Sequence, residues 1–188
     1  MIFLSASVPT PGKEKYYETA DAIAIQAAVR AVVQVVIPTT SLVWGGHPAI
    51  TTMIRHAIGK MNTRLQEQLI LYQSDYFKTV FPKENLFFKH VTHIPETSDK
   101  KVSITHMRHQ MIEEHDFKAA VFIGGMKGVE KEYEFFAKTH PHALLLPVAS
   151  TGGAAKNIYE KLTAAPDKRL LEDYEYISLF QSLLKNYL

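Results

Sequence analysis

Short apolar runs alternate with longer segments of helical periodicity along the chain. The apolar runs have the length of buried strands, and they are Ile2–Ser5, Leu42–Trp44, Leu69–Tyr72, Ala119–Ile123 and Ala143–Val148. Apolar residues recur at helical spacing in Lys15–Val36, Ala49–Gln68, Ser103–Glu114, Val129–Lys138, Ala154–Leu162 and Arg169–Tyr187. Strands that alternate with helices are typical of parallel strands joined by crossover helices. The pattern predicts an α/β fold with a doubly wound, Rossmann-like, mostly parallel sheet and helices on both faces.

One domain is expected to span residues 1–188, with the last helix packed on it. The chain has 188 residues, of which 46% are hydrophobic and 21% charged, and this is the composition of an ordinary globular domain. The stretches with the least regular pattern are Tyr76–Asn85 and Pro95–Lys101. We expect both to be loops, because neither is long enough to link two domains.

The most apolar helical segment, Ala20–Val36, carries a narrow polar stripe. Gln26, Arg30 and Gln34 are spaced four residues apart and so lie on one side of a helix. A membrane-spanning segment does not carry such a stripe, and we predict no membrane contact. Most of this helix must nevertheless be covered. Either a subunit interface of a homodimer or higher homo-oligomer covers it, or the C-terminal helix does.

Composition and charge exclude several classes of function. The chain has 21 Lys and Arg, 19 Asp and Glu and a formal net charge of +2, which gives no basis for binding nucleic acid. It has no cysteine, which excludes disulfides, thiolate metal sites and cysteine nucleophiles. Its nine histidines form no spacing typical of a metal site, so we expect neither a metal nor a cofactor. Because no basic leader precedes the first apolar run, we expect a cytoplasmic protein.

Three predicted strands run directly into glycine pairs that open helices. The first turn is Gly45-Gly46-His47-Pro48, the second Gly124-Gly125 followed by Met126-Lys127-Gly128, and the third Ser150-Thr151-Gly152-Gly153. Parallel strands end at the same edge of a sheet, where ligands of open α/β folds bind. Glycine lets backbone amides approach a phosphate, and a helix N-terminus adds unpaired N–H groups. The three turns predict a phosphate-bearing ligand, with His47 either donating to an anion or filling its loop.

Glu132 is the acidic residue of the second turn region that differs from its neighbours. It lies three residues after Val129 and four before Phe136, at the edge of the apolar row of its helix. The acidic and basic neighbours expected to face water are Glu130, Lys131 and Glu134. Glu132 either binds a ribose hydroxyl or acts in acid–base chemistry, or it only reflects the preference of carboxylates for the first turn of a helix.

Arg108 lies on the inward row of the preceding helix. It is four residues from both Ile104 and Ile112, so it shares their side of the helix. A partly buried guanidinium needs an anionic partner. That partner is a ligand phosphate, Glu132 or another, purely structural carboxylate.

Two kinds of aromatic residue lie near these turns. Trp44 ends an apolar run and is expected in the core rather than on a stacking surface. Tyr16 and Tyr17 open the first helix and are candidates to border a base pocket. No nucleophile elbow and no Walker-type phosphate loop is present in the sequence.

The arginine helix, the strand Ala119–Ile123 and the pattern Gly-Gly-x-x-Gly-x-x-x-Glu resemble the lysine-decarboxylase-like LOG proteins. These are cytokinin-activating nucleotide phosphoribohydrolases of the SLOG superfamily, whose other branches include ligand-sensing domains of bacterial conflict and antiviral systems. The turn here has Ile123 where the hydrolases have proline, one additional residue, and Val129 where they have threonine. The other glycine turns resemble those of the sensor-type branches more closely.

The resemblance implies roles for individual residues. Arg108 and Glu132 match the catalytic arginine and glutamate, and Gly124, Gly125 and Gly128 match the phosphate-binding turn. Ser5 and Ser7 match a serine-containing loop after the first strand.

Two functions follow as expectations, with a third alternative. The first is a ligand sensor of a bacterial signalling or defence system. It would bind an NAD- or ADP-ribose-type molecule or a nucleoside phosphate through the three turns and pass the signal to a separate effector protein. Arg108 and Lys127 would neutralise phosphate charge and Glu132 would bind ribose hydroxyls. The second is a nucleoside-5′-monophosphate N-glycosidase, in which Glu132 stabilises positive charge on the ribose and Arg108 orients the phosphate. The third is an inert adaptor built on a decayed site.

Overall fold

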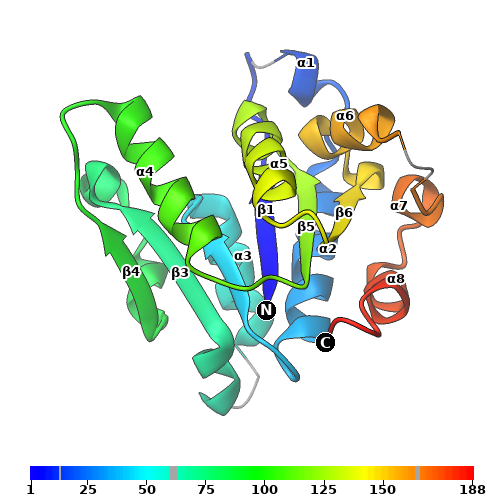
Figure 1. Ribbon diagram of the computed structural model, residues 1–188, viewed down its shortest axis with the longest axis horizontal. Helices are drawn as coiled ribbons and strands as arrows, with labels where there is room; N and C mark the ends of the chain where they lie inside the picture. The colour runs from blue at the N-terminus through cyan, green and yellow to red at the C-terminus, as the bar shows by residue number, and fades with distance from the viewer. Residues whose placement is uncertain (13, 60–62, 164–165) are drawn as a thin grey trace.

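The fold is built on a single sheet of six parallel strands (Figure 1). The computed structural model describes residues 1–12, 14–59, 63–163 and 166–188. The strands are β1 (Ile2–Ser7), β2 (Leu42–Gly45), β3 (Leu69–Ser74), β4 (His90–Ile94), β5 (Ala119–Gly124) and β6 (Leu144–Val148), and their order in the sheet is β4-β3-β2-β1-β5-β6. The predicted parallel α/β architecture is therefore confirmed.

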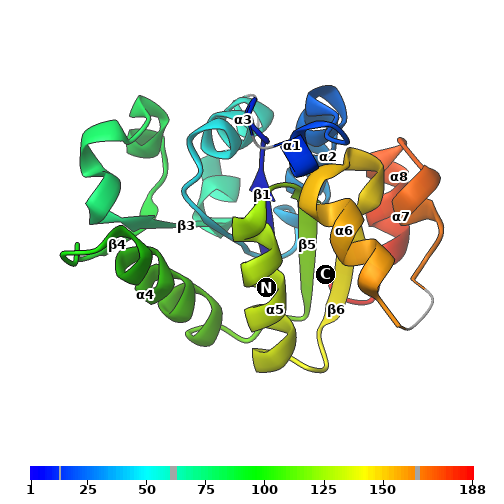
Figure 2. The ribbon, with the colours of Figure 1, turned by 90° about the horizontal axis from the view of Figure 1, so that it is seen from above.

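Helices cover both faces of the sheet, as a doubly wound fold requires (Figure 2). One face carries α2 (Ala22–Val36), α3 (Pro48–Ile58) and α8 (Tyr176–Leu183), and the other carries α4 (Lys100–Glu113), α5 (Lys127–Thr139) and α6 (Gly153–Lys161). Successive strand residues point to opposite faces, so the core has two halves. Leu4 and Trp44 belong to the first half, and Phe3 and Val43 to the second. Trp44 is fully buried, as predicted.

The strand β4 is absent from the elements predicted from the sequence. It is one of the two edge strands of the sheet, and its residues His90 and His93 are exposed. Only Ile94 of β4 is buried, whereas the other edge strand, β6, buries its last three residues, so β4 lacks the apolar run that marks the other five strands. The neighbouring strand β3 extends through Gln73 and Ser74, two residues beyond its predicted end.

Three predicted helices are shorter or divided in the structure. The segment predicted as Lys15–Val36 contains α1 (Glu14–Tyr17) and α2, because Asp21 caps α2 by accepting hydrogen bonds from the amides of Ile23 and Ala24, both at 2.9 Å. The segment predicted as Ala49–Gln68 contains α3 and the 3₁₀ helix η1 (Thr63–Gln68), and residues 60–62 lie outside the described residues.

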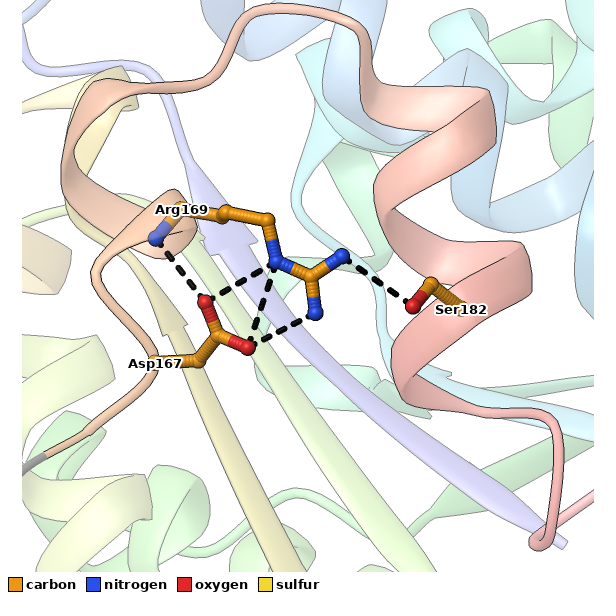
Figure 3. Close-up of polar contacts among 3 residues, drawn as sticks. All are labelled: Asp167, Arg169 and Ser182. Carbon is orange, nitrogen blue, oxygen red and sulfur yellow. Dashed lines mark hydrogen bonds and ion pairs between the residues drawn. The ribbon is translucent and has the colours of Figure 1, made fainter.

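The C-terminal segment forms two helices rather than one. These are α7 (Arg169–Glu172) and α8, separated by Asp173, whose carboxylate accepts a hydrogen bond from the Glu175 amide. The Arg169 guanidinium joins them: it donates to Asp167 through Nε and Nη2, at 3.0 and 2.7 Å, and to Ser182 Oγ at 3.1 Å (Figure 3).

The C-terminal helix α8 packs on α2. Burial under this helix therefore accounts for part of the apolar surface of α2. The polar stripe of α2 lies in a groove that α3 and α8 border. Within the described residues, no helix is both long enough and apolar enough to span a membrane.

Shorter 3₁₀ helices fill the predicted loop after β3. These are η2 (Asp75–Val80) and η3 (Lys83–Phe87), and a further one, η4 (Ala149–Thr151), follows β6. The loop between β4 and α4 ends at Asp99, whose carboxylate caps α4 by accepting from the Val102 amide at 2.9 Å.

Candidate functional site

A cavity of about 310 Å³ lies at the carboxyl ends of β1, β2 and β3, between α4 and α5. This is the edge of the sheet at which ligands of open α/β folds bind. Its walls come from seven segments of the chain: β1, the turn after β2, the end of β3, the η2 region, α4, the turn after β5 and α5. Because strand order places β3 two strands from β1, the cavity has a β1 side and a β3 side.

The β1 side holds a fixed carboxylate. Ser5 Oγ donates to Glu132 Oε2 at 2.6 Å, and Arg108 Nε donates to Glu132 Oε1 at 3.0 Å. The Arg108 and Glu132 side chains are 16% and 15% exposed, and both line the cavity. The three residues come from β1, α4 and α5, far apart in the sequence. The structure thus brings together the arginine and glutamate that the sequence singled out, and of the three alternatives for the anionic partner of Arg108 it shows Glu132.

Gly128 makes room for the Arg108 guanidinium. A Cβ atom at this position would lie 3.2 Å from Arg108 Nη2, closer than an ordinary van der Waals contact. Arg108 therefore lies directly against the first turn of α5. Met126, Gly128 and Val129 of this turn line the cavity, as do Ser7, Gly45, Gly46 and His47 among the predicted residues.

The β3 side of the cavity is largely apolar. Its lining comes from the η2 region, through Phe77, Val80 and Phe81, and from Ile104 and Met107 of α4. Ile104 and Met107 precede Arg108 by four residues and by one, so one face of α4 serves both sides of the cavity. The Tyr76–Asn85 stretch, predicted only as a loop, therefore contributes a wall of the site.

Three polar atoms of the lining are buried without a hydrogen-bond partner in the described part of the chain. They are His47 Nδ1, Gln73 Nε2 and Ser74 Oγ. Burial lowers the pKa of His47 below its ordinary value of 6.5, so its imidazole is neutral at pH 7. His47 is therefore a neutral hydrogen-bonding group rather than a cation for a phosphate. Gln73 and Ser74 are absent from the predicted site residues because the end of β3 carries no glycine pair.

The second and third glycine turns pack against each other. A Cβ atom at Gly153 would lie 2.7 Å from the Gly125 carbonyl oxygen, and one at Gly152 would lie 1.8 Å from the Thr19 carbonyl oxygen. Thr151 Oγ1 donates to the Val148 carbonyl at 2.6 Å and accepts from the Gly124 amide at 2.8 Å. The cavity lining includes none of Gly124, Gly125 and Thr151–Gly153 among the described residues. In this structure these residues hold the start of α6 against β5.

The prediction that Glu130 faces water is wrong. Its side chain is buried, because two residues along a helix is more than half a turn, and Glu130 therefore faces α1 and α6 while Glu132 faces the cavity. It accepts hydrogen bonds from Tyr16 Oη at 3.0 Å, Lys127 Nζ at 3.2 Å and Asn157 Nδ2 at 3.2 Å. Lys127 lies outside the cavity lining within the described residues and is paired with Glu130.

These contacts shift two pKa values. Burial by itself raises the pKa of Glu130, but the hydrogen bonds from Asn157, Lys127 and Tyr16 outweigh it, and the pKa is lowered below its ordinary 4.5. Burial and the Glu130 carboxylate raise the pKa of Tyr16 to about 12. Tyr16 is thus occupied by Glu130, and Tyr17 is exposed. Neither tyrosine borders the cavity in the described structure.

A comparison with protein-family models matches residues 15–184 to the SLOG cluster3 family. The chain belongs to this family. The match covers nearly the whole chain and therefore supports the SLOG superfamily resemblance seen in the sequence. A search of curated proteins found no match, and neither did a search of solved structures.

Membership of the SLOG cluster3 family suggests binding of a nucleotide-related ligand. The cavity is the candidate site for such a ligand, with a carboxylate and a guanidinium on its β1 side and an apolar β3 side. Among the residues that the structure describes, no group of three or more His, Asp or Glu side chains is arranged to hold a metal ion.

Proposed function

We propose that this SLOG cluster3 chain is a ligand sensor that binds a nucleotide-derived small molecule in the cavity between α4 and α5. The ligand is a nucleoside phosphate or a molecule of the NAD and ADP-ribose type. The observation that carries the proposal is the Glu132 carboxylate, fixed on the cavity wall by Ser5 and Arg108.

The two charged groups on the β1 side suit the sugar and phosphate of such a ligand. Carboxylate oxygens accept hydrogen bonds, and ribose offers two neighbouring hydroxyl donors to Glu132. Arg108 uses Nε for Glu132, and a guanidinium carries its other donors on the two terminal nitrogens, in a fork that fits phosphate. The start of α5 at Met126–Gly128 borders the same cavity, and a helix N-terminus carries unpaired N–H groups. In the turn after β2, by contrast, the Gly46 and His47 amides donate to the carbonyls of Tyr72 and Gly45.

Binding without turnover is favoured by the first turn of α5. Val129 is buried and lines the cavity at the position where the hydrolases carry threonine. The turn therefore presents no hydroxyl to a phosphate. The charge-bearing Lys127 is paired with Glu130 and adds no cation to the cavity lining.

An N-glycosidase is the second candidate function, and the fixed position of Glu132 favours it. In this reaction the bond between the base and ribose C1′ lengthens, and positive charge develops on the ribose. A carboxylate already oriented by two donors stabilises that charge without reorganisation. Arg108 would then orient the phosphate, and water would attack C1′.

Mass spectrometry distinguishes the two functions. Purified protein is incubated with AMP, NAD, ADP-ribose and cyclic ADP-ribose, desalted and denatured, and the retained and unbound fractions are analysed. We expect intact nucleotide in the retained fraction and no released base. Free base together with ribose phosphate in the unbound fraction would establish the enzyme instead. If neither bound nucleotide nor product is found, both functions are refuted.

Two variants connect the result to the site. We expect Glu132→Gln to weaken nucleotide affinity and Arg108→Ala to weaken it further, whereas Glu134→Gln, an exposed position on the same helix, should have no effect. In an enzyme, Glu132→Gln would abolish turnover. Unchanged affinity in both Glu132→Gln and Arg108→Ala would show that the ligand binds elsewhere.

Self-association and a separate effector protein remain predictions. Light scattering with and without the bound nucleotide tests the first. Co-purification from a native extract, repeated with the Arg108→Ala variant, tests whether an effector depends on ligand binding.

A further inference from the structure

The two sides of the cavity differ in how their polar groups are satisfied. On the β1 side, both oxygens of Glu132 accept hydrogen bonds. Toward the β3 side, Gln73 and Ser74 are 3% and 1% exposed, yet Gln73 Nε2 and Ser74 Oγ have no partner within the described residues. His47 Nδ1 is likewise buried without a hydrogen-bond partner among the described residues. Buried polar groups without partners are rare in native proteins, because leaving one unpaired costs free energy.

The sheet places these three residues at the carboxyl edge where the cavity lies. Gly45 of β2 is in register with Tyr72 of β3, and the Gly46 amide donates to the Tyr72 carbonyl at 2.9 Å. His47 therefore follows Gly46 beside the point where Gln73 and Ser74 end β3. All three residues line the cavity.

Gly46 determines where the Gln73 side chain lies. A Cβ atom at Gly46 would lie 2.1 Å from Gln73 Nε2 and from its Cδ, so the carboxamide occupies the space that any larger residue would fill. The lack of a side chain at Gly46 therefore leaves room for the Gln73 carboxamide as well as allowing the turn. Gln73, Ser74 and His47 line the same cavity as the apolar side chains of Phe77 and Met107.

We propose that Gln73, Ser74 and His47 bind the polar edge of a nucleobase and determine which base the cavity accepts. This inference rests on the proposed function and adds the part of the ligand that confers specificity. The faces of the base contact the apolar side chains of the β3 side, and its ring nitrogens and exocyclic groups pair with the three unsatisfied atoms. The sugar and phosphate extend to Glu132 and Arg108.

The chemistry of the three groups suits a base rather than a phosphate. A carboxamide nitrogen donates, a hydroxyl donates or accepts, and a neutral imidazole does either at Nδ1 according to its tautomer. Burial keeps His47 neutral at pH 7 by lowering its pKa. Arg108 is the only Lys or Arg in the cavity lining among the described residues, and it lies on the β1 side. A neutral ring with mixed donors and acceptors matches this set of neutral groups.

Isothermal titration with matched ligands tests the inference. Dissociation constants are measured for AMP, IMP, GMP, CMP, UMP and ribose 5-phosphate, which lacks the base. We expect wild-type protein to bind its preferred nucleotide at least tenfold more tightly than it binds the other nucleotides or ribose 5-phosphate. Gln73→Glu keeps the shape of the side chain and removes the donor, and Ser74→Ala removes the hydroxyl. Each should reduce the base preference at least tenfold and leave ribose 5-phosphate affinity within twofold.

Two substitutions at exposed positions serve as matched controls. Gln181→Glu and Ser178→Ala make the same changes at exposed positions of the C-terminal helix and should leave every constant unchanged. An unchanged ranking of bases in both Gln73→Glu and Ser74→Ala would overturn the inference while the proposed function stands. An equal loss for ribose 5-phosphate and for nucleotide would also overturn it. If wild-type protein binds neither ribose 5-phosphate nor any nucleotide, the proposed function fails and the inference fails with it.

A second readout separates recognition from a structural role. Because the Ser74 hydroxyl has no hydrogen-bond partner among the residues that the structure describes, Ser74→Ala should leave the Tm of the free protein unchanged or raise it. The rise in Tm caused by the preferred nucleotide should become smaller in the variant. A fall of several degrees in the free protein, with the nucleotide-induced rise unchanged, would assign Ser74 to the structure and overturn its role in recognition.

Discussion

Gly152 and Gly12 both have positive φ angles, but replacing each by alanine should have very different consequences. Gly152 has φ +69° and ψ −158°, and a Cβ atom there would lie 1.8 Å from the Thr19 carbonyl oxygen and 2.9 Å from Ala20 Cα. Gly12 has φ +85°, and, its chain neighbours aside, no atom of the described residues lies within 4 Å of the position of its Cβ. Gly12→Ala is therefore a matched control with the backbone strain and without the steric overlap.

The magnitudes follow from these contacts. The conformation of Gly152 is one that other residues hardly adopt and costs about 1–3 kcal/mol. Displacing the Thr19 backbone adds an overpacking cost of about 1–3 kcal/mol. We expect Gly152→Ala to lower the free energy of unfolding by about 4 kcal/mol, a large part of the stability of a domain of this size. Gly12→Ala should lower it by only about 1–2 kcal/mol.

Urea denaturation at 25 °C, followed by the fluorescence of Trp44, measures both changes. Equal losses in Gly152→Ala and Gly12→Ala would refute the reasoning, because the close approach to Thr19 would then have no energetic weight. A small loss of stability with a large loss of nucleotide affinity in Gly152→Ala would contradict the packing role and assign Gly152 to the ligand.

Three further predictions concern individual hydrogen bonds. Glu130→Gln should lower the free energy of unfolding by about 2 kcal/mol at pH 7. The folded-state pKa of Glu130 lies below the ordinary 4.5, so its stabilisation is present above pH 4.5 and disappears as the pH falls through the folded-state pKa. Urea titrations at acid pH should therefore show the difference in free energy of unfolding between wild type and Glu130→Gln becoming smaller. A difference that stays constant with pH would contradict the pairing. Thr151→Val should lower the free energy of unfolding by about 2 kcal/mol, because both buried hydrogen bonds of the Thr151 hydroxyl are lost. Isothermal titration should show unchanged nucleotide affinity in this variant. Ser5→Ala removes a donor to Glu132 and should weaken nucleotide binding about fivefold, with a Ser178→Ala control; unchanged affinity would show that Ser5 does not position the carboxylate.

Most of the sheet could be predicted from the sequence because burial on both faces leaves a continuous apolar signal. β5, for example, is buried at every residue, and the pattern located it to within one residue. β4 left no such signal at the edge of the sheet. Helix boundaries depended on single side chains. Asp21 caps α2 and divides a segment that periodicity alone treats as continuous.

The site could be predicted where its residues follow the helical repeat. The spacing of Arg108 from its apolar neighbours placed it inward, and the same reasoning placed Glu132 at the edge of the apolar row. Glu130 was misplaced because the face it occupies is covered by α1 and α6, whose positions are set by tertiary packing. Local sequence does not show that packing.

The glycine turns show a second reason for incomplete prediction. A strand end followed by two glycines is needed both where a ligand approaches the backbone and where another segment of chain does. At Gly46 and Gly128 the nearby space holds the side chains of Gln73 and Arg108, and both glycines line the cavity. At Gly152 and Gly153 another stretch of backbone fills it. Gln73 belongs to no sequence motif. It stands out because its buried Nε2 has no hydrogen-bond partner among the described residues, which only the folded chain reveals.

The strand order has a practical consequence for dividing the polypeptide. Ser5, His47 and Gln73 all precede the loop after β4, and Arg108 and Glu132 follow it. A cut between Glu96 and Thr97 leaves the contact of Glu96 with Lys78 in one piece and those of Thr97 with Ser103 in the other. Each piece then carries one half of the cavity, and β1 regains its β5 neighbour only when the two associate. A molecule that fills the cavity, as we propose, would therefore contact both pieces.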